Sequence, residues 1–124
     1  MNRVWGQSLC GISSPVYCWA DRELGKGFDM EKIQSKDGTV IAYERCGTGP
    51  PLVLVHGTLA THERWGNISK MLAQKFTVYA IDRRGRGESG DTEPYALERE
   101  FEDIAAVVDS IGQGVNLLGH SHGA

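Results

Sequence analysis

The sequence predicts an α/β fold of three layers, in which helices cover both faces of a parallel sheet. Short apolar runs such as residues 52–55 and 76–81 have no polar face, and each ends at a polar or glycine-rich turn, as strands buried on both sides do. Amphipathic segments with helical spacing alternate with these runs. This alternation favours a parallel sheet, because each helix carries the chain back to the start of the next strand.

The folded part opens with a β-hairpin. Polar and apolar residues alternate on both sides of Asp37-Gly38, a dipeptide that favours a tight turn. The second strand of the hairpin is expected at residues 39–46. A cluster of glycine and proline at 47–51 then leads into the strand at 52–55.

Two helices are predicted between the remaining strands. The first spans residues 61–74, where Gly66 weakens the helix by about 1 kcal/mol relative to alanine. The second spans 97–111, and its charged residues, including Asp103, are expected on a solvated face. The apolar stripes expected to face the sheet are Trp65, Ile68, Met71 and Leu72 in the first helix, and Leu97, Phe101, Ile104, Ala105, Val108 and Ile111 in the second.

A last buried strand is predicted at residues 115–118, after Gly112 ends the second helix. The order is therefore a β-hairpin followed by βαβαβ, within a domain of residues 30–124. Residues 1–29 show no periodicity of either kind. We expect a disordered extension or an upstream translated stretch there, with a short ordered arm as the alternative.

Composition argues against several classes of function. The 124 residues hold 13 lysines and arginines against 16 aspartates and glutamates, so a net charge of −3 offers no basic surface for nucleic acid or an anionic membrane. No apolar run reaches the length of a membrane span. The cysteines, Cys10, Cys18 and Cys46, lack metal-ligand spacing. A cytoplasmic protein without metal or organic cofactor is the expectation.

The first chemical motif is Gly119-His120-Ser121-His122-Gly123, directly after the predicted last strand. In the pattern G-x-S-x-G the serine occupies a strained turn between a strand and a helix, which points its Oγ out of the sheet edge. The flanking glycines relieve the crowding of that turn, since they lack a Cβ. The pattern predicts a nucleophile at Ser121.

The second motif, His56-Gly57-Thr58, follows an earlier strand. Acyl transfer develops negative charge on a carbonyl oxygen, and preorganised N–H groups stabilise that charge. One donor is expected from the backbone of His122, and the other from the loop after Gly57, at Thr58 or Leu59. Both loops are predicted at the carboxyl edge of the sheet, where open α/β sheets place their sites.

The third motif is the arginine- and glycine-rich loop at residues 82–89. Its three arginines raise phosphate or RNA binding as a candidate, but the stretch is short and the protein is acidic. The glycines do not open onto a helix, as a nucleotide fingerprint requires. A structural loop, in which Asp82 binds neighbouring backbone, is the favoured interpretation.

Taken in this order, the motifs resemble those of the α/β-hydrolase family, and the resemblance covers residues 31–124. It implies an eight-stranded sheet with the elbow strand near its centre, of which this chain supplies the N-terminal part, truncated at the nucleophile elbow. The activity implied is hydrolysis of an ester or related small-molecule acyl substrate through an acyl-enzyme. The residues implied are Ser121 as nucleophile, Thr58 and His122 as oxyanion-hole amides, and His56, Gly57, Gly119, Gly123 and Asp82 as supporting residues.

In that family the triad acid and histidine follow the serine in the chain. The histidines present here are assigned to loops or packing instead, and the nearby carboxylates precede the serine. The chain is therefore expected to be inactive by itself, as a fragment or a truncated reading frame. The alternative is a non-catalytic module that binds a partner along an open sheet edge, with residues 115–118 as an unpaired apolar strand. The residues set aside as base or acid are His56, His62, His120, His122, Asp82, Glu88, Asp91 and Glu93.

Overall fold

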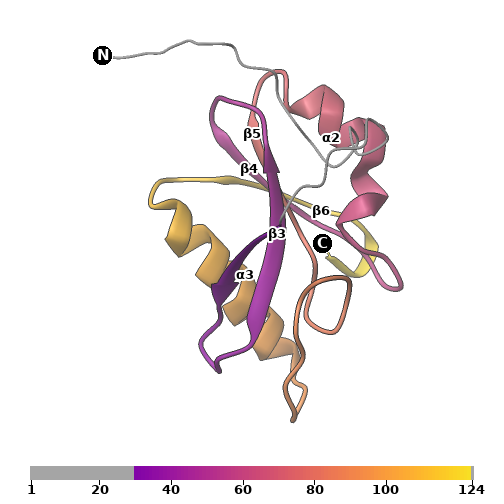
Figure 1. Ribbon diagram of the computed structural model, residues 1–124, viewed down its shortest axis with the longest axis vertical. Coiled ribbons are helices and arrows are strands. Elements are labelled where there is room, and N and C mark those ends of the chain that lie inside the picture. Colours follow the sequence, from indigo (N-terminus) through magenta and orange to yellow (C-terminus); the bar gives the residue numbers. More distant parts are fainter. Residues whose placement is uncertain (1–29, 124) are drawn as a thin grey trace.

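The computed structural model describes residues 30–123, so the expectation for residues 1–29 lies outside the described residues. A five-stranded mixed sheet with the order β2-β3-β5-β4-β6 forms the centre of the molecule (Figure 1). The predicted hairpin is present, and its second strand also pairs antiparallel with β5. β4 runs parallel to both β5 and β6. The strands are β2 (Glu31–Gln34), β3 (Val40–Cys46), β4 (Pro51–Val55), β5 (Thr77–Ile81) and β6 (Asn116–Gly119).

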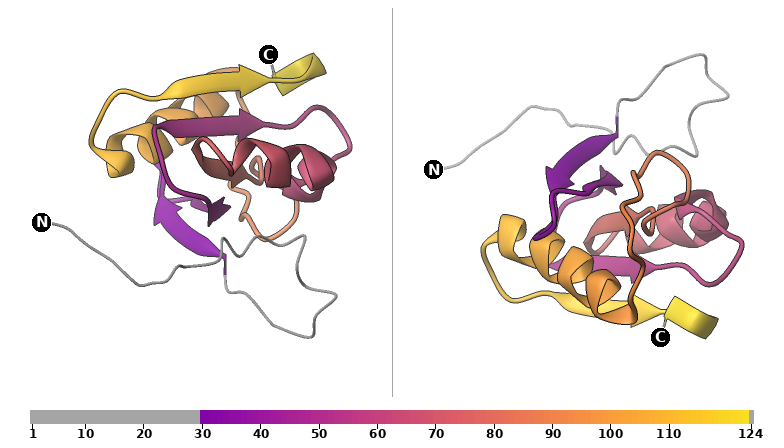
Figure 2. Two further views of the ribbon diagram at one scale, coloured as in Figure 1. Left: turned by 90° about the horizontal axis from the view of Figure 1, so that it is seen from above. Right: turned by 90° about the horizontal axis from the view of Figure 1, so that it is seen from below.

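Helices cover both faces of the sheet, which confirms the three-layer prediction. The 3-10 helix η2 (His62–Trp65) and helix α2 (Gly66–Leu72) lie on one face, and helix α3 (Leu97–Ile111) lies on the other (Figure 2). Strand β4 is buried along its whole length. Leu52 and Leu54 pack toward η2 and α2, while Val53 and Val55 pack toward α3. Its continuous apolar run therefore follows from contact with both layers.

The first helix differs from the prediction in two ways. It begins as the 3-10 helix η2 and becomes α-helical only at Gly66, whose φ of 25° breaks the regular backbone. The buried side also differs in part: Trp65 and Leu72 pack against the core as expected, but Ile68 and Met71 are 49% and 69% exposed. Ser69 and Ala73 face the sheet instead.

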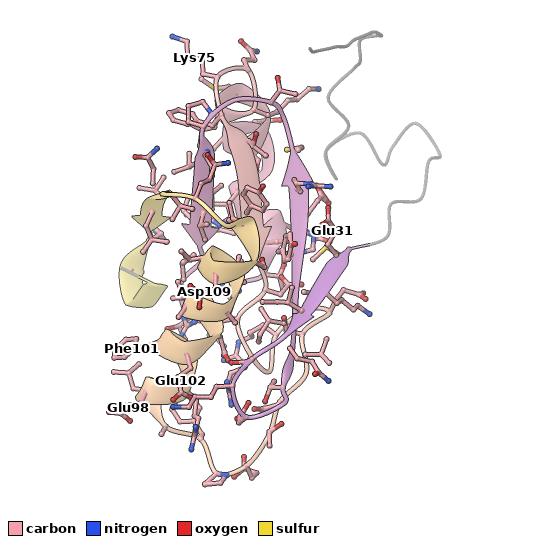
Figure 3. All side chains as sticks on the ribbon, turned by 90° about the vertical axis from the view of Figure 1, so that its left-hand side faces the viewer. Glu31, Lys75, Glu98, Phe101, Glu102 and Asp109 are labelled. Carbon is pink, nitrogen blue, oxygen red and sulfur yellow. The ribbon has the colours of Figure 1, made fainter. Side chains whose placement is uncertain are left out.

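Helix α3 has the predicted bounds, and Ile104 and Ile111 of the predicted apolar stripe pack against the core, but the start of that stripe does not. Leu97 and Phe101 are 44% and 58% exposed, and Figure 3 shows Phe101 on the side of α3 that points away from the sheet. The buried face holds Glu100, Asp103 and Val107. Asp103 was expected in solvent, yet it is 3% exposed. The spacing of apolar residues did not predict this buried face, because two carboxylates on the helix are paired with arginines of the preceding loop.

The pairing of Arg84 ties three segments together. Its guanidinium forms two 2.7 Å hydrogen bonds with Asp103 of α3 and reaches Asp37 of the hairpin turn at 3.0 Å. The Arg84 side chain is 1% exposed, so its charge depends on these carboxylates. The hydrogen bonds from Arg84, and then those from Thr39, hold the pKa of Asp37 well below its usual range. The loop after β5 is thereby fixed to both the helix and the hairpin.

Strand β6 lies at the edge of the sheet, and nothing in residues 30–123 pairs with its outer side. The prediction of a strand here is confirmed, but the prediction that it is buried is wrong, because Leu117 and Leu118 are 56% and 42% exposed. An edge strand with exposed leucines on both faces is unusual for a solvated surface. None of the helices described between residues 30 and 123 combines the length and the apolar character needed to cross a membrane.

We predict that Asp103→Asn lowers the free energy of unfolding by about 3 kcal/mol, because it leaves the buried Arg84 guanidinium without its main counter-charge. The matched control is Glu102→Gln on the same helix. Glu102 pairs with the exposed Lys36 and with Arg99, and its loss should cost less than about 1 kcal/mol. Urea denaturation at neutral pH measures both values. Equal losses in the two variants would contradict a structural role for the Arg84 cluster.

Candidate active site

The backbone at Ser121 has the strained conformation that the G-x-S-x-G pattern predicts. Ser121 follows β6, begins the 3-10 turn η3 (Ser121–Gly123) and has a φ of 57°. A residue with a Cβ rarely adopts positive φ, so this value marks a turn held by its surroundings. The turn is anchored by hydrogen bonds from His120 N–H to Val55 O and from Gly123 N–H to His120 O. Ser121 itself is exposed at the edge of the sheet.

Two glycines allow this turn to sit against the end of β4. A Cβ on Gly57 would lie 3.0 Å from the Cβ of Ser121 and from the carbonyl oxygen of His120. A Cβ on Gly123 would overlap the carbonyl oxygens of Val55 and His56. Position 123 therefore requires glycine because two backbones approach closely, and a side chain at position 57 would fit only tightly. Gly119 is the last residue of β6 and lies opposite Val55 in the parallel ladder.

The same contacts bring the two predicted oxyanion segments together. Thr58 and Leu59 start the loop after Gly57, and His122 follows Ser121 in the elbow. Thr58 also lines a cleft of about 320 Å³ together with Arg83, Arg84, Arg86, Asp91, Tyr95 and Glu100. Ser121 is not among the lining residues, so this cleft lies beside the elbow loop rather than directly over the serine.

His56 is a fully buried link between the ends of β4 and β5. Its Nε2 accepts the backbone N–H of Arg83 at 3.0 Å, which requires a lone pair on Nε2. Its Nδ1 therefore carries the proton and donates to Gly57 O at 2.8 Å. Burial lowers the pKa of His56 below its ordinary value. Both ring nitrogens are used in these bonds, so His56 supports the loop and does not act as a base.

Asp82 is buried at the end of β5 and organises the neighbouring loops. Its Oδ1 accepts two hydrogen bonds from His62, from the backbone N–H at 2.7 Å and from Nδ1 at 2.9 Å. Its Oδ2 accepts the N–H of Glu88 at 2.9 Å, and Gly87 leaves room for that approach. Burial alone raises the pKa of Asp82, but these hydrogen bonds outweigh burial and lower it. The structure thus gives Asp82 the backbone-binding role that the sequence suggested.

Two of the three arginines of the loop, Arg83 and Arg84, are engaged by carboxylates, which weakens the phosphate-binding interpretation. Arg83 forms hydrogen bonds of 2.8 and 2.6 Å with the two carboxylate oxygens of Glu100, and Tyr95 donates to the same carboxylate at 3.1 Å. The pKa of Arg83 is raised by the hydrogen bond to Glu100. The partners Glu100 and Asp103 were missed from the sequence. Their spacing of three residues on α3, after two consecutive arginines, is the signal that could have identified them.

Two further histidines near the candidate site make other contacts within the described part of the chain. His62 is 3% exposed and bonded to Asp82, and His120 lies edge-on to Trp65 with ring centroids 6.4 Å apart. The side chain of His122 lies outside the described residues. No group of three or more potential metal ligands occurs among the residues that the structure covers.

We predict that neutral His56 makes stability depend on pH. Because its pKa is lowered in the folded state, its contribution is complete above the unfolded-state value of 6.5 and is lost as the pH falls below it. His56→Gln cannot titrate, and its Oε1 can still accept the Arg83 N–H. Urea denaturation between pH about 7.5 and about 5 should show a shallower loss of stability in H56Q, by at most about 1.4 kcal/mol per pH unit. Identical pH profiles would exclude His56 as the titrating group.

The comparisons with known sequences agree on one family. A family model described as the alpha/beta hydrolase family matches residues 52–124, more than half of the chain. The probable oxidoreductase EphD of Mycobacterium tuberculosis is 33% identical over 99 residues, a match that covers 74% of this chain and 17% of that protein. The chain therefore spans about a sixth of the length of this curated relative.

Solved structures share the arrangement of strands and helices. An alpha/beta hydrolase from Sphaerobacter thermophilus DSM 20745 is 52% identical with a TM-score of 0.69, over 72% of this chain and 35% of that one. The esterase RhEst1 from Rhodococcus sp. ECU1013 is 34% identical with a TM-score of 0.72, over 77% of this chain and 38% of that one. With the parallel strands, the elbow at Ser121 and the family match in agreement, the chain belongs to the alpha/beta hydrolase family.

Proposed function

We propose that Ser121 is the nucleophile of a serine hydrolase that acts on an ester or related acyl substrate. The observation that carries this proposal is the φ of 57° at Ser121, directly after a parallel strand and on an exposed turn. Strain of this kind on a non-glycine residue persists where the surrounding structure imposes it, and such residues cluster at active sites. Serine rather than aspartate at this position favours acyl chemistry over epoxide opening or dehalogenation.

The proposed reaction has two halves. Ser121 Oγ adds to the acyl carbon as its proton passes to a base, and the carbonyl oxygen becomes an oxyanion that accepts hydrogen bonds from the amides of Thr58 and His122. Each such donor contributes about 3–4 kcal/mol to transition-state stabilisation. Collapse of the intermediate expels the alcohol with a proton and leaves an acyl-enzyme. Water then attacks the acyl carbon and releases the acid.

The hydrogen bonds of His56 and His62 support the proposal that this chain alone forms the acyl-enzyme slowly. Both ring nitrogens of His56 are hydrogen-bonded, and Nδ1 of His62 is committed to buried Asp82. In serine hydrolases, loss of a triad member lowers turnover by up to about 10⁶-fold. We propose that residues 1–124 carry the nucleophile and the oxyanion loop without an effective base. A cytoplasmic location and a small-molecule acyl substrate, without nucleic-acid partners, belong to the same proposal.

A fluorophosphonate probe tests the nucleophile on this chain. We expect slow modification that mass spectrometry locates at Ser121, at about 10⁻⁶ of the rate of a complete triad. Ser121→Ala should remove the modification, whereas Ser110→Ala, which removes a hydroxyl at the end of α3, should not. Fast stoichiometric labelling would show that the chain has its own base. Labelling that is equal in the wild type and S121A would exclude Ser121 as the nucleophile.

The exposed edge of β6 favours a second candidate function, a module that binds a partner strand. Leu117 and Leu118 are 56% and 42% exposed on a strand whose outer edge is unpaired within residues 30–123. Sedimentation of the wild type should show loss of monomer as concentration rises, and Leu117→Lys should restore the monomer. Met71→Lys, an equally drastic change at an exposed position of α2, should behave as the wild type. A monomer at all concentrations would count against this candidate.

A further inference from the structure

The loop at residues 57–61 holds a second strained residue that its own side chain does not explain. Leu59 has a φ of 60°, a conformation that costs a non-glycine residue about 1 kcal/mol. Its side chain is 88% exposed, so burial of the leucine does not offset this cost. The conformation must therefore be imposed by the segments that flank the loop.

Both ends of the loop are fixed to consecutive residues at the end of β5. At the first end, buried His56 accepts the N–H of Arg83 and donates to Gly57 O. At the second end, His62 donates its backbone N–H and its Nδ1–H to one oxygen of Asp82, at 2.7 and 2.9 Å. The two anchors together determine the span that the five intervening residues must bridge.

The anchor at Asp82 is itself rigid. Asp82 is 0% exposed, and its other carboxylate oxygen accepts the N–H of Glu88. Its backbone N–H donates to Ala42 O in β3, and its carbonyl accepts the hydroxyl of Ser89. His62 is therefore bonded to a group that cannot move with the loop, and charge-assisted hydrogen bonds to a carboxylate are among the stronger ones in proteins.

We propose that His62 is a positioning residue for the oxyanion hole: its pairing with Asp82 holds the distal end of loop 57–61 so that Leu59 stays at positive φ. This inference rests on the proposed function for its catalytic meaning. The amides of Thr58 and Leu59 lie in the sequence between the two anchors, so the anchored span restricts the directions in which they can point. Oxyanion donors are effective only when they are held in place before the reaction.

A direct role for His62 in proton transfer does not fit its surroundings. Its side chain is 4% exposed, and neither His62 nor Asp82 lines the cleft beside Thr58. An Asp–His pair that acts as a base needs a path from the imidazole to the nucleophile. The buried location favours mechanical anchoring of the loop instead.

Three variants of the 124-residue chain separate the anchor from general packing. His62→Leu removes the Nδ1 bond and keeps an apolar side chain. His62→Asn keeps a side-chain N–H where Nδ1 lies. Arg64→Leu, at an exposed position of the same 3-10 turn, is the matched control. If H62L shows no cooperative unfolding, His62→Gln replaces it, because its amide extends one bond too far to reproduce the Nδ1 position.

The first measurement is amide hydrogen exchange of residues 58–60, compared with the amides of β5. We expect residues 58–60 to exchange about tenfold faster in H62L, while exchange of the β5 amides changes only as much as the global stability of the variant does. Exchange in H62N and R64L should stay near that of the wild type. Equal acceleration of loop and strand would overturn the proposal, because it would mean that His62 supports the fold as a whole.

The second measurement is a double-mutant cycle between His62 and Leu59, whose side chains are not expected to touch. Leu59→Gly removes the strain only where the anchor imposes positive φ. The urea midpoint shift caused by L59G should be more favourable in the wild type and H62N than in H62L, by about 0.5 M. Additive shifts would overturn the proposal, since a purely structural role lowers all midpoints without changing the effect of L59G.

The third measurement links the loop to chemistry. Residual fluorophosphonate labelling of Ser121 should fall by about a hundredfold in H62L and persist in H62N and R64L. If the loop loosens in H62L but labelling is unchanged, the positioning role is wrong. If the wild type shows no labelling beyond S121A, the proposed function fails, while exchange and the double-mutant cycle still decide whether His62 anchors the loop.

Discussion

The buried carboxylate of Asp82 is the interaction on which the candidate site depends. A charge with 0% exposure is tolerated only when hydrogen bonds replace its lost hydration. His62 and Glu88 supply those bonds from two different loops, and Gly87 is the residue that permits the second approach. Because each donor must reach the same carboxylate, both loops take one arrangement at the end of β5. The arrangement of these loops thus follows from the hydrogen bonds that stabilise the single buried charge of Asp82.

The elbow is constrained by backbone contact instead of charge. β6 pairs with β4, and the turn at Ser121 then folds back over the carbonyl oxygens at the end of β4. Only glycine fits at position 123, because the backbones are too close for a Cβ, and the space at Gly57 is tight. Strand β4, which packs against both helical layers, therefore also fixes the turn at Ser121 and the loop after Gly57 relative to each other. Strand β4 therefore contributes both to the packing of the core and to the geometry of the candidate site.

Periodic patterns predicted the strands better than they predicted the helix faces. The apolar run of β4 required no knowledge of its neighbours, because burial on both faces is a local pattern. The stripe of α3 was right at Ile104 and Ile111 but wrong at its start, because Glu100 and Asp103, which look like solvated residues, are buried against Arg83 and Arg84. A carboxylate is buried or exposed according to its partner, and the partners lie 17 and 19 residues away.

The sequence by itself determined the strand–helix order, the glycines of the elbow and the location of Ser121 after a strand, since these depend on backbone space and on periodicity within short segments. The tertiary structure decided which carboxylates are buried, which histidines are committed and how loop 57–61 is held. These features depend on hydrogen bonds between residues 17 to 27 positions apart, such as His62 with Asp82 and His56 with Arg83. No local pattern encodes such a pairing, because it exists only once the sheet has brought the ends of β4 and β5 together.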